Sequence, residues 1–221
     1  MSDIVTITGV YVGQARDMSS DGTPTAIAKE AMRSAVAVSD VGLDGDEQAD
    51  SDSHGGPERA LSHYPAEHYA VWGQHYRGTS DRLGPGALGE NISTNGLTER
   101  NVRVGDVFRM GTAVVEVSQP RQPCWKISEH LGLPDLAREV AASGRSGWLY
   151  RVLETGYVGP GDVVERVRAA EHGITIARMW ALHNATHPDL EELEVLAGLD
   201  VLADGWRQRL AERLDWLRRH A

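Results

Sequence analysis

The stretch GDVFRMGTAVVEVSQ, residues 105–119, places β-branched and aromatic residues on both sides of Met110-Gly111. Such residues favour extended backbone, and a glycine between two such runs is typical of a hairpin turn. The stretch therefore predicts two antiparallel strands joined at Met110-Gly111. WLYRVLETG at 148–156 and GDVVERVR at 161–168 predict two further strands of the same kind.

The rest of the first 170 residues alternates short strand patterns with glycine-rich segments. IVTITGVYVG (4–13) and SAVAV (34–38) predict strands, whereas AEHYAVWGQHY (66–76) and LPDLAREVAASG (133–144) have helical spacing. GLDGDEQADSDSHGGPER (42–59) has no periodicity and predicts a long loop of the kind that is often functional. Many short strands separated by glycines favour a barrel or a sandwich through about residue 168.

The pattern changes to helical near residue 172. The last 50 residues contain three helical segments, ITIARMWALHN, DLEELEVLAGL and DGWRQRLAERLDWLRRH. In the last one Trp206, Leu210, Leu214 and Leu217 share a face, which predicts the side that packs. We therefore expect a β domain over 1–170 and a three-helix accessory domain over 171–221.

Charge and composition narrow the possible partners and compartments. The formal net charge is −10, which argues against binding duplex nucleic acid or an anionic membrane surface. A single cysteine in 221 residues fits a reducing compartment. Residues 1–30 lack a secretory pattern, and no apolar run approaches ~18 residues. We expect a cytoplasmic protein that does not insert into a membrane.

That single cysteine lies in QPRQPCWK, residues 119–126. A lone cysteine is usually a small buried hydrophobe. Here, however, Pro120 and Pro123 stiffen a turn, and Arg121 and Lys126 would stabilise a thiolate, the form that attacks electrophiles and binds metals. Three roles for Cys124 remain open: a nucleophile, a persulfide carrier, or a soft ligand to a metal or cofactor.

A nucleophilic or proton-transferring role requires a base beside the thiol. His54, in the glycine-rich SHGG turn, is the best-placed candidate in the sequence. Nothing in the sequence brings His54 to Cys124, so this catalytic role is an expectation about the tertiary structure.

Several motifs in the same order resemble those of the MOSC family, named for the C-terminal domain of molybdenum-cofactor sulfurase, and most of all its YiiM-type branch. They are GDEQADSDSHGG with ERALSHYPAEHYAVW, GALGENIS, VRVGDVFRMGTAVVEVSQPRQPC with its cysteine motif, GRSGWLYRVLETGYVGPGD, and the three C-terminal helices. The resemblance covers most of the chain. Arg59 stands where the branch has lysine and Leu88 where it has phenylalanine, which affects only details of the site.

The resemblance implies a mainly β (α+β) fold: a MOSC-type closed β-barrel with a few helices, followed by a small three-helix C-terminal domain. It implies molybdopterin-bound molybdenum as the cofactor, with Cys124 as the protein ligand to the metal. It also implies an oxidoreductase that reduces small N-hydroxylated substrates such as hydroxylaminopurines, converting N–OH to N–H and releasing water.

An anionic cofactor needs local cations and hydrogen-bond donors on this acidic chain. The candidates on the matching segments are Arg59, Arg121, Lys126, Arg145 and Arg151, the backbone amides of Gly55 and Gly56, and the side-chain amide of Asn91. Each has a purely structural alternative. Arg151 could pair with a carboxylate such as Glu154 or Glu165, Arg145 could cover a helix end, and Asn91 could hold its own turn together.

A reductase of this kind also requires an external electron donor, of the ferredoxin, flavodoxin or reductase type, because one cysteine cannot hold an iron–sulfur cluster. The arginines of the last helix could dock an acidic donor, although a solvated helix face is the favoured explanation of them. The sequence leaves two other functions open: a sulfur carrier with a Cys124 persulfide, and a module that binds or delivers the cofactor without turnover. The oligomeric state is also open.

Overall fold

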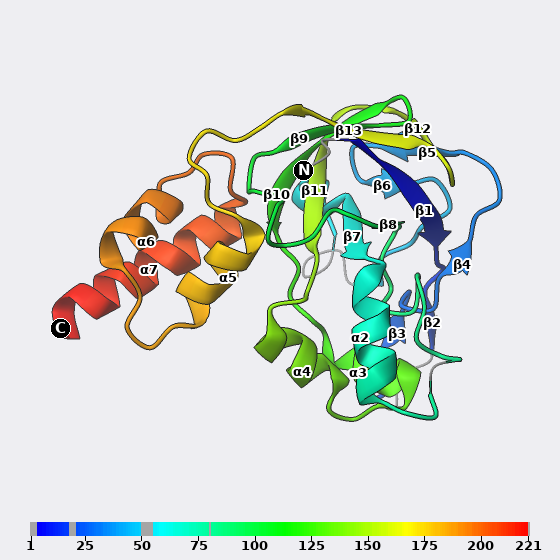
Figure 1. Ribbon diagram of the computed structural model, residues 1–221, viewed down its shortest axis with the longest axis horizontal. Coiled ribbons are helices and arrows are strands. Elements are labelled where there is room, and N and C mark those ends of the chain that lie inside the picture. The colour runs from blue at the N-terminus through cyan, green and yellow to red at the C-terminus, as the bar shows by residue number, and fades with distance from the viewer. Residues whose placement is uncertain (1–3, 18–20, 50–54, 80, 221) are drawn as a thin grey trace.

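A closed β-barrel forms the centre of the computed structural model, which describes residues 4–17, 21–49, 55–79 and 81–220 (Figure 1). Seven strands follow one another in the order β13-β9-β10-β11-β7-β8-β1, and β13 pairs with β1 to close the ring. These strands are β1 (Ile4–Val12), β7 (Leu61–Pro65), β8 (Ile92–Thr94), β9 (Val107–Met110), β10 (Ala113–Pro120), β11 (Trp148–Glu154) and β13 (Val163–Arg168). Closure pairs the edges of the sheet. The expected barrel is confirmed.

The predicted hairpin forms two neighbouring strands of this barrel, β9 and β10. β9 and β10 pair antiparallel, with Met110 opposite Ala113 and Gly111 at a φ of +55° in the turn. Every residue of β10 is buried, because the strand contacts α5 on the outside of the barrel as well as its neighbours in the sheet. Burial on both faces explains why AVVEVSQP lacks a clean alternation of apolar and polar residues.

Short strands extend the barrel at its margins. β4 (Glu30–Ala31) adds to β1, while β12 (Gly156–Val158), β5 (Val36–Ser39) and β6 (Gly42–Leu43) form a separate small sheet. β2 (Arg16–Asp17) pairs with β3 (Pro24–Thr25). The described parts of the predicted loop 42–59 contain only β6 and one 3₁₀ turn, η1 (Pro57–Arg59).

Three helices pack together beside the barrel. α2 (Glu67–His75) and α4 (Leu136–Ser143) are the two predicted helices, and α4 ends at Gly144, whose φ of +70° suits glycine. α3 (Trp125–Leu131) was not predicted and begins directly after Cys124. The three helices share a buried cluster that includes Tyr64, Trp72, Leu88, Ile127 and Leu136.

The C-terminal helices are α5 (Ile176–Asn184), α6 (Leu190–Ala197) and α7 (Asp204–His220), and they lie together on one side of the barrel (Figure 1). Trp206, Leu210 and Leu214 are buried and Leu217 is partly buried, as the sequence predicted. These residues belong to the same apolar cluster as the barrel core. The change of element type near residue 170 is therefore clear, whereas the division into two domains stays a prediction.

No helix in the described part of the chain combines the length and the apolar composition that a membrane-spanning helix needs.

Candidate functional site

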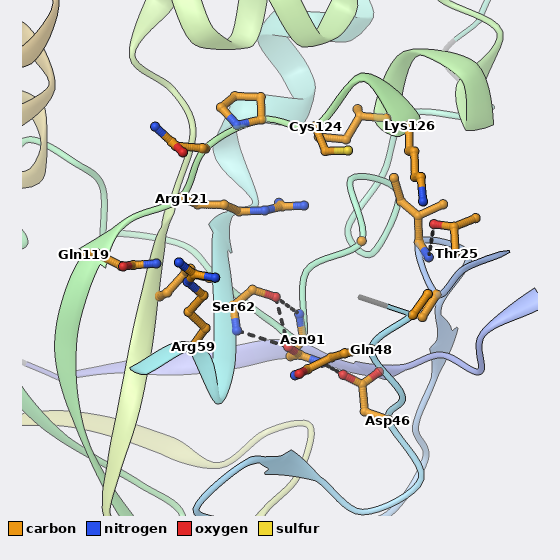
Figure 2. Close-up of a pocket in the computed structure, with 18 of the residues that line it drawn as sticks. Thr25, Asp46, Gln48, Arg59, Ser62, Asn91, Gln119, Arg121, Cys124 and Lys126 are labelled. Atoms are coloured by element: carbon orange, nitrogen blue, oxygen red, sulfur yellow. Dashed lines mark hydrogen bonds between the residues drawn. The ribbon is translucent and has the colours of Figure 1, made fainter. Parts of the chain in front are cut away.

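A cavity of about 390 Å³ opens beside Cys124 (Figure 2). Its walls come from segments that are far apart in the sequence: residues 25–29, 46–49 and 119–127, the strand ends at Ser62 and Asn91, and the first turns of α7. The volume lies in the range of small-molecule binding sites, which is roughly 300–1,000 Å³. The cysteine motif and the residues next to it contribute more of the lining than any other segment.

Cys124 is a half-buried free thiol at the point where the chain leaves β10 and enters α3. The backbone of this segment is anchored to the barrel, because the Arg121 N–H donates to the carbonyl of Gly147 at 3.1 Å. Gly147 has a φ of +74°, and a Cβ there would come within 2.1 Å of the His63 carbonyl oxygen. The thiol therefore stands on a segment whose position depends on a close backbone approach that only glycine permits.

Two of the expected cations, Arg121 and Lys126, line the same cavity as the Cys124 thiol. The Arg121 side chain crosses the space between Cys124 and the Ser62–Asn91 pair, and its guanidinium donates to the Leu88 carbonyl (Figure 2). Lys126 donates to the Pro24 carbonyl at 2.9 Å on the far side. Both side chains are positioned by backbone carbonyls, so their charges are not neutralised by those contacts.

Asn91 lies in the cavity wall as a hydrogen-bond junction. Its Oδ1 accepts from the backbone N–H and the hydroxyl of Ser62, at 3.0 and 2.9 Å. Its Nδ2 donates to the Tyr11 carbonyl at 3.2 Å and to Asp46 Oδ2 at 2.7 Å. The amide joins β1, β7 and the acidic loop, which is the structural role that the sequence left open beside cofactor binding.

An ion pair in the same wall was missed by the sequence analysis. Lys29 contacts Asp46, and their side chains are only 7% and 2% exposed. Burial lowers the pKa of Lys29, and the neighbouring Asp46 carboxylate partly offsets that effect. No local pattern signals this pair, because the two residues lie on different irregular segments that meet only in the folded chain.

Glu90 lies behind the wall, between the lining residues Gly89 and Asn91. Its Oε1 accepts from the Tyr69 hydroxyl at 2.7 Å and from the Gly86 N–H at 2.6 Å. Its Oε2 is buried without a hydrogen-bond partner among the described residues. Burial raises the pKa of Glu90, and its hydrogen bonds and Arg121 oppose the shift. This burial was not visible in the sequence.

The structure does not bring all of the expected site residues together. Arg59 lines the cavity, but Arg145 lines a second cavity between α4 and α5. Arg151 is engaged by Glu58 and by Glu116, the latter at 2.7 Å, and so takes the carboxylate-pairing alternative with different partners from those expected. Gly55 and Gly56 are absent from the described cavity lining. His54 lies outside the residues that the structure describes.

Charge distinguishes this cavity from the acidic protein as a whole. Among the described lining residues are five cations, Lys29, Arg59, Arg121, Lys126 and Arg209, but only two carboxylates, Asp46 and Glu47. Asp46 faces Lys29, and Glu47 accepts from the Ala15 N–H at 2.9 Å. A cationic cavity with a half-buried thiol in its wall suits an anionic ligand that carries a soft metal. The residues present therefore fit a molybdopterin-type cofactor.

Comparison with known proteins gives the same assignment along most of the chain. Residues 50–165 match the MOSC domain family. Protein YiiM of Escherichia coli is 44% identical over 207 residues, which are 92% of this chain and 90% of that protein. A protein named Reductase from Gibberella moniliformis is 34% identical over 190 residues, 84% of this chain but only 34% of that protein.

A solved structure supports the same relationship. The crystal structure of YiiM from Geobacillus stearothermophilus superposes with a TM-score of 0.80 and 31% identity, covering 95% of this chain and 99% of that one. The likeness includes the C-terminal helices as well as the barrel, because nearly all of both chains is covered. The chain therefore belongs to the MOSC domain family.

Proposed function

We propose that this protein is a molybdenum-cofactor-dependent oxidoreductase that reduces N-hydroxylated compounds such as hydroxylaminopurines. The observation that carries the proposal is the half-buried Cys124 thiol in the wall of a cation-rich cavity, on a chain of the MOSC family. The similarity to a protein named Reductase supports a redox function.

Each part of the site has a physical role in this proposal. The Cys124 thiolate would ligate the molybdenum, since thiolates suit soft metal centres. Arg121 and Lys126 would bind the anionic groups of the cofactor. When bound, the cofactor supplies the two electrons that cleave the N–O bond, so that R–NHOH, two electrons and two protons give R–NH₂ and water.

Groups of the protein must deliver the two protons that the reaction consumes. Glu90 is buried next to the cavity wall, and its pKa is raised by burial, so it can hold a proton at a pH where an exposed glutamate has lost it. It is the residue of this chain that we assign to proton storage for the reaction. Electrons come from an external donor of the ferredoxin, flavodoxin or reductase type.

The proposal is tested on protein produced in a molybdenum-replete host. We expect bound molybdenum, pterin fluorescence after oxidation, and N-hydroxyl reduction with a small artificial electron donor. Cys124→Ala should abolish reduction and leave the melting temperature unchanged, because the thiol makes no capping hydrogen bond to α3. His130→Ala, an exposed change on the same helix, should retain both metal and activity.

Three results would reject the proposal. Full activity of Cys124→Ala with cofactor loaded would remove the ligand assignment. Labile sulfur on a metal-free protein would favour the sulfur carrier with a Cys124 persulfide. Bound cofactor without turnover by any donor would favour a binding or delivery module.

A further inference from the structure

The arginines of α7 are mostly satisfied within the chain. Arg207 pairs with Asp200 and Asp204, at 2.9 and 2.5 Å, and Arg218 pairs with Glu194 at 2.6 Å. Arg213 donates to the Ala185 carbonyl, and Arg219 donates to the Asp215 carbonyl at 3.1 Å. Carboxylates therefore neutralise Arg207 and Arg218, while backbone carbonyls hold Arg213 and Arg219 in place without neutralising their charge.

Arg209 is the exception on this helix. It is exposed and makes neither a hydrogen bond nor an ion pair with the part of the chain that the structure describes. Its guanidinium carbon lies 5.1 Å from the centre of the Trp206 ring. Trp206 is 3% exposed, and its ring packs edge-on against the His183 ring with 4.8 Å between the ring centres. The indole ring on which the Arg209 guanidinium lies is therefore held in place by its neighbours.

This stacked guanidinium lies at the cavity. Gly205, Trp206 and Arg209 all line it, although they belong to the segment predicted to be an accessory domain. The α7 segment reaches the cavity because the Ala203 N–H donates to the Ser118 carbonyl at 3.0 Å, directly before Gln119 of the wall. α7 thus brings the Arg209 cation into the lining of the cavity.

Cations lie on both sides of Cys124 in the cavity. Figure 2 shows Lys126 and Thr25 on one side, Arg59 and Gln119 on the other, and the Arg121 side chain between these two groups. Arg59 and Arg209 both line the cavity, and they come from η1 and α7, elements more than a hundred residues apart. Two guanidiniums from separate walls, with a nearby amide, match the several oxygens of a phosphate monoester.

We propose that Arg209, together with Arg59, binds the phosphate of the substrate, so that the N-hydroxylated substrate is a purine nucleoside monophosphate rather than a free base. The inference rests on the proposed function, because it identifies the substrate class for that reaction. The cations on the Lys126 side of Cys124 remain for the anionic groups of the cofactor. A substrate phosphate and the cofactor's own phosphate are the same chemistry, so the experiment must separate them.

The test measures binding of AMP and adenosine, neither of which carries an N–O bond, to the cofactor-loaded protein by calorimetry. We expect AMP to bind at least about tenfold more tightly than adenosine, a difference of about 1.4 kcal/mol, because the phosphate gains charge-assisted hydrogen bonds that adenosine cannot make. Arg209→Ala should remove that preference. Arg207→Ala, on the same helix but paired with aspartates, should retain it. Molybdenum and pterin content should be unchanged in both variants.

Other outcomes overturn the inference in distinguishable ways. Equal affinities for AMP and adenosine in the wild type would refute it, while turnover of a free hydroxylaminopurine would still uphold the proposed function. Loss of cofactor from Arg209→Ala would show that Arg209 holds the cofactor's phosphate instead. A preference for AMP that depends on Arg209, in a protein that binds no molybdenum, would reject the proposed function and leave the phosphate site standing.

Discussion

Replacing Asn91 by aspartate is the most direct test of how the cavity wall is built. The substitution keeps the size of the side chain and keeps Oδ1 as an acceptor for the two Ser62 donors. It replaces the Nδ2 donor with an oxygen that faces Asp46 Oδ2, now 2.7 Å from the amide nitrogen, and the Tyr11 carbonyl. The change therefore converts two attractive contacts into repulsive ones at nearly constant volume.

The expected loss of stability follows from these contacts. A hydrogen bond to a charged group contributes about 1.5–3 kcal/mol and a neutral one about 1 kcal/mol, and an added buried charge increases the penalty. We therefore expect Asn91→Asp to lower the free energy of unfolding by about 3–5 kcal/mol near pH 8. Lowering the pH should reduce the deficit, because the introduced carboxyl can take up a proton and donate again.

The assay is urea unfolding followed by tryptophan fluorescence at pH 5 and pH 8. Asn95→Asp, which introduces the same charge at an exposed position, is the control and should be near neutral at both pH values. An Asn91→Asp protein as stable as the wild type at pH 8, with no change between the two pH values, would refute the amide orientation and the junction described here.

Three other substitutions test the buried Glu90, the placement of two arginines and the close backbone approach at Gly147. Glu90→Gln should weaken the pH dependence of the free energy of unfolding. Because the pKa of Glu90 is raised in the folded protein, its stabilising contribution is present below the ordinary pKa of 4.5 and is lost as the pH rises through the folded pKa. Urea midpoints between pH 4.5 and 8 should therefore decline with pH in the wild type and decline less in the variant. Arg121→Glu should lower the molybdenum and pterin content of purified protein, whereas Arg145→Glu should not, because Arg145 lies on the other cavity; equal losses would contradict the placement of these two side chains. Gly147→Ala should lower the free energy of unfolding by about 2 kcal/mol or more, since the added Cβ would overlap the His63 carbonyl and the positive φ disfavours alanine; an unchanged thermal midpoint would count against that contact.

Local patterns in the sequence predicted most of the secondary structure. The hairpin around Gly111, the strands β1, β11 and β13, helices α2 and α4, and the three C-terminal helices lie where β-branched runs, helical spacing and glycines indicated. α3 was missed because its seven residues, between a proline-rich turn and Gly132, are too short to show a helical period. These successes and this failure share a cause: periodicity reports which face of an element is buried.

The placement of Arg121, Cys124 and Lys126 in one cavity was also within reach of the sequence, because they belong to one eight-residue motif. Arg145 and Arg151 belong to motifs as well, yet one lies on a second cavity and the other pairs with Glu58 and Glu116. A motif shows that a residue is near the site along the chain. It does not show in which direction its side chain leaves the backbone.

Only the tertiary structure decided the rest of the site. The Lys29–Asp46 pair, the buried Glu90 and the α7 guanidinium of Arg209 reach the cavity through segments that meet only when the barrel closes and the helices pack against it. Burial, ion pairing and pKa shifts depend on which distant segments surround a group, and local spacing carries no information about those partners. The sequence alone determined the family, the main strands and the cysteine motif, while long-range packing determined the charges around Cys124.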